Sequence, residues 1–323
     1  MKAVLCKAFG PPSALAIEDV PEPAPGPRQV VVAVRACGVN FPDALMVQGK
    51  YQFKPPFPFS PGNEVAGTVL RLGSEVEGVR VGDRVIAFTS HGGFAEQVAA
   101  DADRLVHMPD DMDFVHASAF VMTYGTALHA LKDRGRIEAG ESLLVLGAAG
   151  GVGTAAIEVG KAFGARVIAA ASSADKLALC RECGADETID YAAEDLRERL
   201  RELGPRGLDV VFDPVGGPYS EPALRAMGWN GRFLVIGFAA GEIPRIPLNL
   251  PLLKSCSIVG VFWGAFLRRD PDETAAHLRD LVRLHAEGKL RPRVSATYGL
   301  EDAPVALTDL LERRVKGKVV IVP

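Results

Sequence analysis

The sequence predicts an α/β protein in which a compact, mostly antiparallel β-rich barrel precedes a doubly wound parallel sheet. In the first third of the chain, short β-type runs are separated by turns rich in proline and glycine, which is typical of small barrels. From about residue 123 to about residue 266, strand-like runs alternate with helical segments. That alternation favours parallel strands joined by helices.

The β-rich part contains one predicted helix, over residues 41–47, and a proline-dense linker over residues 21–27. Alternating apolar residues bounded by turn residues indicate its strands. These predicted strands cover residues 1–8, 29–37, 65–72, 84–88 and 94–99.

The second part begins with an apolar strand that includes residues 144–146. Strand and helix then alternate, with helices predicted over 155–163 and 174–183 and strands over 165–171, 208–212, 232–236 and 257–262. After residue 268 we expect a helix over 273–286, a strand, a helix and a terminal strand over 318–322 that rejoins the first domain. The predicted domains are therefore 1–122, 123–266 and a return segment over 267–323.

Composition is typical of a globular enzyme and excludes several partners. The chain has 323 residues, 48% of them hydrophobic, and a net charge of −4, which argues against binding to nucleic acid or to an anionic membrane. Five cysteines and no recognisable signal peptide lead us to expect a cytoplasmic protein. Cys180 and Cys183 form a C-x-x-C near the end of a predicted helix, where the helix dipole does not activate a thiol, so a packing role is favoured.

Glycines spaced by three follow the apolar strand at Gly147, Gly150 and Gly153. Such glycines permit a tight turn, close approach of the backbone to a pyrophosphate, and close packing of the next helix on the sheet. The first turn of that helix, with Gly151 and Val152, then presents N–H groups and a favourable dipole to the phosphates. A plain glycine-rich turn is the alternative, but the strand and helix order supports a dinucleotide site.

The end of the next strand indicates which dinucleotide binds. A site for NAD usually carries an Asp or Glu about 20 residues after the glycines, to hold the ribose 2′-hydroxyl. Here Ser172 and Ser173 stand at that place, and Lys176 follows one helical turn later. Two hydroxyls and an ammonium suit the 2′-phosphate of NADPH, although the adjacent Asp175 and a simple solvated role for Lys176 are alternatives.

Several segments together resemble the medium-chain dehydrogenase/reductase superfamily, and specifically its zinc-free quinone oxidoreductase (zeta-crystallin-like) branch. The resemblance covers essentially the whole chain and implies a GroES-like barrel domain beside a Rossmann domain that holds a nicotinamide cofactor. The matching segments are residues 37–43, 61–67, 82–85, 123–126, the glycine motif and 213–217.

The chain departs from the zinc alcohol dehydrogenases of the same superfamily at the metal positions. Asn40 stands where those enzymes have their first zinc cysteine, and Asn63 stands in place of the histidine of their Gly-His-Glu. Amides are poor zinc ligands, and the chain has no cysteine between Cys37 and Cys180 that could hold a structural zinc. None of the six histidines has a recognisable ligand spacing. We therefore expect no metal.

Without a metal, the chemistry must suit an acceptor that takes hydride readily, such as a quinone or an enone. The resemblance places Asn40, Asp43 and Tyr51 around the acceptor oxygen and the nicotinamide. Asn40 and Tyr51 would donate hydrogen bonds, and Asp43 would orient its neighbours. The alternatives are a turn residue, a helix cap and a loop aromatic, respectively.

The resemblance also implies further cofactor contacts. Tyr191 would lie beside the 2′-phosphate, and Phe238 and Trp263 would lie near the nicotinamide. Packing in the core or at a dimer edge is the alternative for these aromatic residues. The remaining residues implied along the cofactor are Thr126, Gly237, Phe262 and Gly264.

The expected function is NADPH-dependent reduction of quinones or related conjugated alkenes by hydride transfer without zinc. One alternative is an enoyl-thioester reductase, of the acryloyl-CoA type, or a haloacrylate reductase on the same scaffold. Another is a non-catalytic NADPH-binding protein, like the lens crystallins that resemble this branch. An exposed edge strand over 257–262 makes a homodimer the expected assembly.

Overall fold

The computed structural model describes residues 1–323, and the chain forms two compact units. Unit 1 consists of Met1–Met122 and Pro292–Pro323, and unit 2 of Thr123–Arg291. The predicted return segment was therefore wrong over 267–291, which belongs to unit 2. The physical reason is that helix α10 (Pro271–Ala286) buries His277, Leu281 and Leu284 within unit 2, with His277 against Asp133 and Phe266.

Unit 1 is built on a seven-stranded sheet, which is antiparallel apart from one parallel pair. Its main order is β14 (Val294–Tyr298), β15 (Lys318–Ile321), β3 (Gln29–Gly38), β4 (Glu64–Leu72), β5 (Arg84–Phe88) and β7 (Leu105–His107), and β6 (Gln97–Asp101) also pairs with β3. A separate hairpin joins β1 (Lys2–Leu5) to β2 (Ala16–Asp19). The helices of this unit are α1 (Phe41–Val47), α2 (Phe114–Ala117) and α11 (Ala303–Leu311), and α3 (Val121–Leu128) begins in it.

The long strand β3 lies at the centre of unit 1. Val30, Val32 and Val34 alternate along it and are all buried in one apolar core. Its last residues pair with the terminal strand β15, Cys37 with Ile321 and Gly38 with Val320. The expectation that the terminal strand returns to the first domain is thereby confirmed, and it brings Lys318 to the residues that follow β3.

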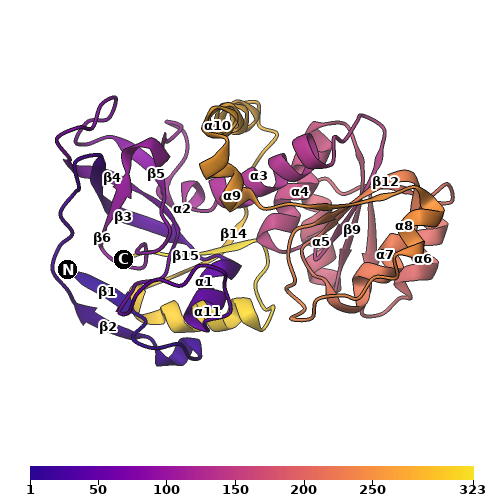
Figure 1. Cartoon of the computed structure of the whole chain (residues 1–323), viewed down its shortest axis with the longest axis horizontal. Helices are drawn as coiled ribbons and strands as arrows, with labels where there is room; N and C mark the ends of the chain where they lie inside the picture. Colours follow the sequence, from indigo (N-terminus) through magenta and orange to yellow (C-terminus); the bar gives the residue numbers. More distant parts are fainter. The chain divides into compact units, whose positions relative to one another are not determined.

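Unit 2 contains a six-stranded parallel sheet in the order β10-β9-β8-β11-β12-β13, with helices beside it (Figure 1). Its strands are β8 (Ser142–Leu146), β9 (Arg166–Ala171), β10 (Glu187–Asp190), β11 (Leu208–Asp213), β12 (Met227–Val235) and β13 (Ser257–Gly260). Its helices, besides α3 and α10, are α4 (Gly151–Ala162), α5 (Ala174–Glu182), α6 (Leu196–Leu203), α7 (Ser220–Arg225), α8 (Asn249–Lys254) and α9 (Trp263–Arg269). The predicted doubly wound domain is confirmed.

Strand β8 is buried along its whole length, as expected for a central parallel strand with helices on both faces. Helix α4 packs on this strand at Gly160, where an added Cβ would lie 2.6 Å from Leu143 Cδ2. Close packing of α4 fixes where its first turn lies relative to the end of β8.

Helix α3 continues directly into a π-helical segment, η3 (His129–Arg134). π-Helical turns are rare and occur frequently at functional sites. The sequence pattern did not predict this segment. None of the helices combines the length and the apolar composition that crossing a membrane requires.

Candidate functional site

The glycine motif adopts the conformation that the sequence predicted for a dinucleotide turn. Gly147 leaves β8 with φ +57°, a left-handed conformation that glycine adopts at little cost. Gly150 is the residue that precedes α4, and the helix begins at Gly151. The first N–H groups of α4, from Gly151 onward, have no partner within the helix and form the positive end of its dipole.

The glycines at 150 and 153 meet different surroundings. A Cβ at Gly153 would lie 2.6 Å from the carbonyl oxygens of both Gly147 and Ala148, so the fold itself requires glycine there. A Cβ at Gly150 would come no closer than 3.4 Å to any neighbour, which is ordinary contact. Packing within the chain therefore does not require glycine at 150, whereas close approach of a phosphate would.

Hydroxyl groups and an ammonium group gather where β9 ends. Lys176 Nζ donates to Ser172 Oγ at 3.3 Å, and the Ser173 hydroxyl accepts the backbone N–H of Lys176 at 3.5 Å, capping α5. The backbone N–H of Tyr191 donates to Ala171 O at 3.1 Å, which fixes Tyr191 beside the end of β9. The structure thus brings these four predicted residues to one region of unit 2.

Tyr219 is a residue of this region that sequence reasoning missed. Its ring centroid lies 4.5 Å from that of Tyr191. Tyr219 follows the turn after β11, which Asp213 organises by accepting the backbone N–H groups of Val215 and Gly216 and the Ser220 hydroxyl. The predicted motif at 213–217 is the only sequence signal that pointed to this turn.

The aromatic residues predicted along the cofactor differ in accessibility. Phe238 and Phe262 are 37% and 56% exposed, whereas Trp263 is only 4% exposed. Trp263 packs so closely on Gly125 that a Cβ there would lie 2.4 Å from its ring. Burial favours the packing role for Trp263. The other predicted positions of this group, Thr126, Gly237 and Gly264, lie on α3, after β12 and in α9.

In unit 1, Asn40 lies at the centre of a buried polar network. Its Nδ2 is within hydrogen-bonding distance of Gly38 O at 3.3 Å, Asn63 Oδ1 at 3.1 Å and Glu64 Oε2 at 3.2 Å. Its Oδ1 accepts from Lys318 Nζ at 2.6 Å. Since Nδ2 carries two hydrogens and faces three acceptors, one of these contacts is always surplus.

Asp43 belongs to the same network through the backbone. Its Oδ2 accepts the N–H of Asn40 at 2.8 Å, closing a capping box on α1, and its Oδ1 accepts the N–H of Gly62 at 3.2 Å. The helix-cap alternative for Asp43 is therefore observed. The cap also ties α1 to the segment that carries Asn63.

Lys318 and Glu64 complete the network, and sequence reasoning missed both. Lys318 Nζ also donates to Val39 O at 2.8 Å and lies 3.7 Å from Glu64 Oε2. Glu64 Oε1 accepts the N–H of Met122 at 2.8 Å. Lys318 is 278 residues from Asn40 along the chain, so only the pairing of β15 with β3 brings them together.

Burial dominates the electrostatics of this network. It raises the pKa of Asp43 to about 7, against the lowering effects of the Asn40 N–H and the Lys318 ammonium. It also raises the pKa of Glu64 and lowers that of Lys318, while the attraction between these two groups opposes both shifts. Each charge in the network is therefore stabilised chiefly by a neighbour rather than by water.

The network does not suit a zinc ion. Zinc in proteins is held by thiolates, imidazoles and carboxylates. Here the Glu64 carboxylate already accepts from the Asn40 amide and lies 3.7 Å from the Lys318 ammonium, the Asp43 carboxylate accepts two backbone N–H groups, and burial raises the pKa of the Cys37 thiol well above its ordinary value. The side-chain ammonium group of Lys318 already supplies the positive charge beside Glu64.

Tyr51 borders a small apolar cluster of unit 1. It packs against Cys6, Met46, Val47 and Phe59. The loop-aromatic alternative for Tyr51 thus has direct support, and a role beside Asn40 remains a proposal.

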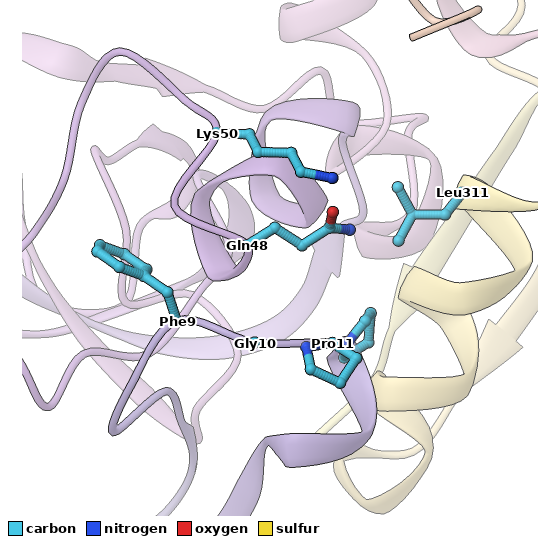
Figure 2. Close-up of a pocket in the computed structure, with 7 residues that line it drawn as sticks. Phe9, Gly10, Pro11, Gln48, Lys50 and Leu311 are labelled. Carbon is cyan, nitrogen blue, oxygen red and sulfur yellow. The ribbon is translucent and has the colours of Figure 1, made fainter.

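A surface hollow of about 430 Å³ lies beside the end of α1 in unit 1. Figure 2 shows the Lys50 and Gln48 side chains extending into it, opposite Leu311. Phe9, Gly10, Pro11 and Pro12 complete its lining. None of the predicted site residues lines this hollow, so it is not the candidate reaction site.

The C-x-x-C pair behaves as the sequence predicted. Cys180 and Cys183 are free and buried at the end of α5. Burial, with the neighbouring Cys183, raises the pKa of Cys180 to about 12. A thiol of this kind is inert at neutral pH, which supports a packing role.

Comparison with known proteins agrees with both units. Residues 26–110 match the alcohol dehydrogenase GroES-like domain family, and residues 151–281 match the zinc-binding dehydrogenase family. The chain is 39% identical over 325 residues to a quinone oxidoreductase-like protein 2 homolog of Nematostella vectensis, covering 99% of this chain and 88% of that protein.

Solved structures extend this similarity to the fold. A probable oxidoreductase from Mycobacterium abscessus superposes with a TM-score of 0.90 at 40% identity, covering 100% of this chain and 99% of that one. The Escherichia coli quinone oxidoreductase, solved in complex with NADPH, superposes with a TM-score of 0.93 at 28% identity over 100% of both chains. The chain therefore belongs to the quinone oxidoreductase branch of the medium-chain dehydrogenase/reductase superfamily.

Proposed function

We propose that this protein is an NADPH-dependent reductase of quinones and related conjugated alkenes that works without zinc. The observation that carries the proposal is the grouping of Ser172, Ser173 and Lys176 at the end of β9, with no carboxylate at the position that binds the ribose of NAD. The NADPH complex of the Escherichia coli relative supports the same choice of cofactor.

In this proposal the residues of unit 2 bind and orient NADPH. The first turn of α4, at Gly151, Val152 and Gly153, receives the pyrophosphate, and the absence of a side chain at Gly150 leaves room for it. Lys176, held by Ser172, supplies a positive charge to the 2′-phosphate. When bound, NADPH supplies the hydride.

The residues of unit 1 stabilise the charge that develops on the acceptor oxygen. Asn40 is the proposed donor; its two Nδ2 hydrogens already face three acceptors, so donating to the substrate means giving up one contact, of which the longest is that to Gly38 O at 3.3 Å. The Lys318 ammonium on Oδ1 polarises the amide and makes its N–H a stronger donor. Lys318 is thus a positioning residue. Tyr51 is a second proposed donor, and Asp43 keeps its capping role and transfers no proton.

Zinc independence is proposed from the donor set around Asn40, and a cytoplasmic location from the five free cysteines. A reduced quinone is a weakly basic oxyanion, so hydrogen-bond donors can replace a Lewis acid. Solvent can then supply the final proton.

Initial rates of NADPH oxidation with a panel of acceptors test the proposal. A para-quinone and a simple enone should be reduced faster than an enoyl thioester, and NADPH should be preferred over NADH. Faster reduction of the enoyl thioester would favour the acyl-CoA alternative. Tight NADPH binding without turnover of any electrophile would contradict an enzymatic role.

A further inference from the structure

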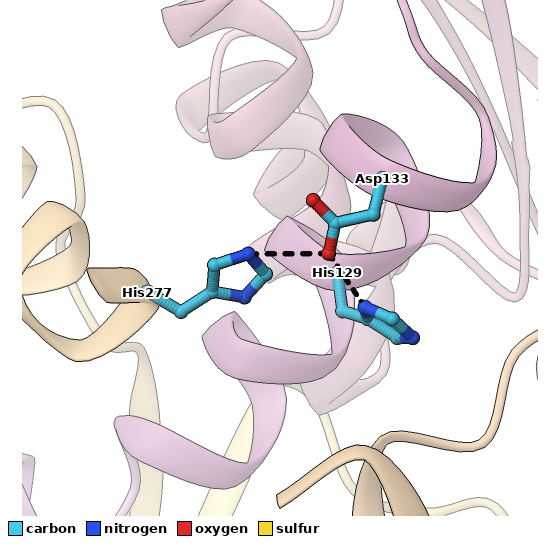
Figure 3. Close-up of side chains that lie close together, drawn as sticks. All are labelled: His129, Asp133 and His277. Carbon is cyan, nitrogen blue, oxygen red and sulfur yellow. Dashed lines mark hydrogen bonds and ion pairs between the residues drawn. The ribbon is translucent and has the colours of Figure 1, made fainter. Parts of the chain in front are cut away.

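A cluster of metal-binding groups lies in unit 2, and none of its three residues is assigned above to the acceptor or the cofactor. His129 and Asp133 are four residues apart on the π-helical segment η3, and His277 comes from α10. Figure 3 shows both imidazole rings directed toward the Asp133 carboxylate. One ligand atom from each residue lies within 4.8 Å of the other two. We propose that these three side chains form a binding site for a zinc ion.

The distances between the three side chains suit coordination of one shared metal ion. Asp133 Oδ2 lies 2.7 Å from His129 Nδ1 and 3.1 Å from His277 Nε2. Tetrahedral ligand atoms about 2.0–2.2 Å from a zinc ion stand roughly 3.3–3.6 Å apart, so the two contacts would lengthen by less than about 1 Å. Small side-chain rotations are therefore enough to receive the ion.

His277 is the strongest single indication. It is 2% exposed; its Nε2 contacts the Asp133 carboxylate at 3.1 Å but in a geometry that does not make a hydrogen bond, and its Nδ1 has no hydrogen-bond partner. Leaving a buried polar nitrogen unsatisfied costs free energy, and such groups call for an explanation. A metal ion bound at Nε2 would satisfy that nitrogen.

The surroundings hold the other two ligands in place. The His129 ring stacks on Phe266, with centroids 4.2 Å apart. Burial tends to raise the pKa of Asp133, but the hydrogen bond from His129 and the close contact with His277 outweigh it and hold that pKa below its ordinary value. Because its pKa is lowered, the Asp133 carboxylate is ionised at neutral pH. The nearby Lys132 ammonium is paired with Asp280 at 2.8 Å and does not occupy the cluster.

The ligand chemistry selects the metal. Two imidazoles and one carboxylate suit zinc and its spectroscopic substitute cobalt, whereas magnesium and calcium prefer oxygen ligands alone. Three protein ligands leave the fourth tetrahedral position to water. The ion would link η3 to α10, so the site would stabilise unit 2 and take no part in hydride transfer.

Metal titration of chelator-treated protein tests the proposal. Isothermal titration with Zn²⁺ should show one saturable site, and Zn²⁺ should raise the melting temperature. Losing even a residue that supports a ligand commonly weakens metal affinity about 10–100-fold, so His277→Gln should weaken it by at least that much. The matched control is His116→Gln, which breaks an exposed His–Asp pair that has no third ligand, and it should keep full affinity.

Two further measurements keep the test decisive. If His277→Gln does not fold, Asp133→Asn replaces it, because that side chain is partly exposed. Cobalt should give a visible spectrum without the intense thiolate band that binding to Cys180 or Cys183 would produce. Absence of a saturable site, or binding that survives both substitutions, would overturn the proposal while leaving the reductase function untouched.

Discussion

At the scale of single residues, Lys318 determines what Asn40 can do. The ammonium group binds Asn40 Oδ1, so the amide cannot flip, and its N–H groups face Asn63 and Glu64. If Asn40 only formed a turn, its side chain would not need the three side-chain partners Asn63, Glu64 and Lys318. The network therefore gives the amide a single orientation.

Removing the proposed donors should reveal their role. Asn40→Ala and Tyr51→Phe should slow reduction of weak acceptors most, by a few kcal/mol of transition-state stabilisation at the upper limit, and strong acceptors least. The affinity for NADPH should remain nearly unchanged. Rates measured across quinones of different reduction potential check this. Wild-type rates for both variants on every acceptor would mean that Asn40 only organises its network and Tyr51 only packs.

Asp43 should make the stability of the fold depend on pH. Burial raises its pKa to about 7, so the native state holds the proton more tightly than the unfolded chain. Its contribution to the free energy of unfolding is then complete below about pH 4 and is lost as the pH rises through 7, by at most about 1.4 kcal/mol per pH unit.

Denaturant unfolding of wild type and Asp43→Asn between pH 5 and pH 8 measures this effect. The variant loses one hydrogen-bond acceptor at every pH, which is a constant offset. The stability advantage of the wild type should therefore shrink as the pH rises. Parallel curves would show that Asp43 stays ionised in the folded protein.

At the scale of elements, the end of β9 and the start of α5 set the cofactor preference. Lys176→Ala should raise the KM for NADPH about tenfold, consistent with losing one charge-assisted contact of about 1.5 kcal/mol. Kinetics with NADH should hardly change, because NADH lacks the 2′-phosphate. Steady-state kinetics with both cofactors provide the test. An equal loss with NADH would assign the lysine to folding instead.

The elements also show what local sequence can predict. Strand β5 was predicted with its observed bounds, because it is a short apolar run closed by clear turn residues. Helix α4 begins four residues before its predicted start, since its first turn is made of glycines and Val152, which have no helical periodicity. Strand β13 ends at Gly260 instead of Phe262.

Features set by tertiary contacts could not be predicted. The glycine motif could be recognised in the sequence, because the backbone geometry of a dinucleotide turn requires glycine at fixed positions. The Lys318 contact and the placement of α10 in unit 2 depend on residues more than 100 positions apart. Periodicity in a short window carries no information on such pairs.

At the scale of the whole molecule, the free edge of β13 supports the expected homodimer. Strand β13 pairs only with β12, and apolar side chains are exposed on β13 and on the neighbouring α8. Leu252 is 77% exposed, and Leu248, Leu253 and Ile258 are also exposed. We propose that a second copy of the chain covers this surface and extends the sheet.

Light scattering should find about twice the chain mass of 34.3 kDa. Ile258→Lys should shift the protein toward monomer, because a charge would be buried in the interface. Val81→Lys, at an exposed apolar residue of unit 1, is the matched control and should leave the mass unchanged. A monomeric wild type would exclude the proposed assembly.

We propose that hydride passes from NADPH to the acceptor without a metal ion. The decisive measurement is the rate of NADPH oxidation on mixing chelator-treated protein with a quinone, using NADPH with hydrogen or deuterium at C4. We predict an undiminished rate after chelation and a slower reaction with the deuterated cofactor. Loss of activity on chelation that zinc restores, in wild type and in His277→Gln alike, would contradict it.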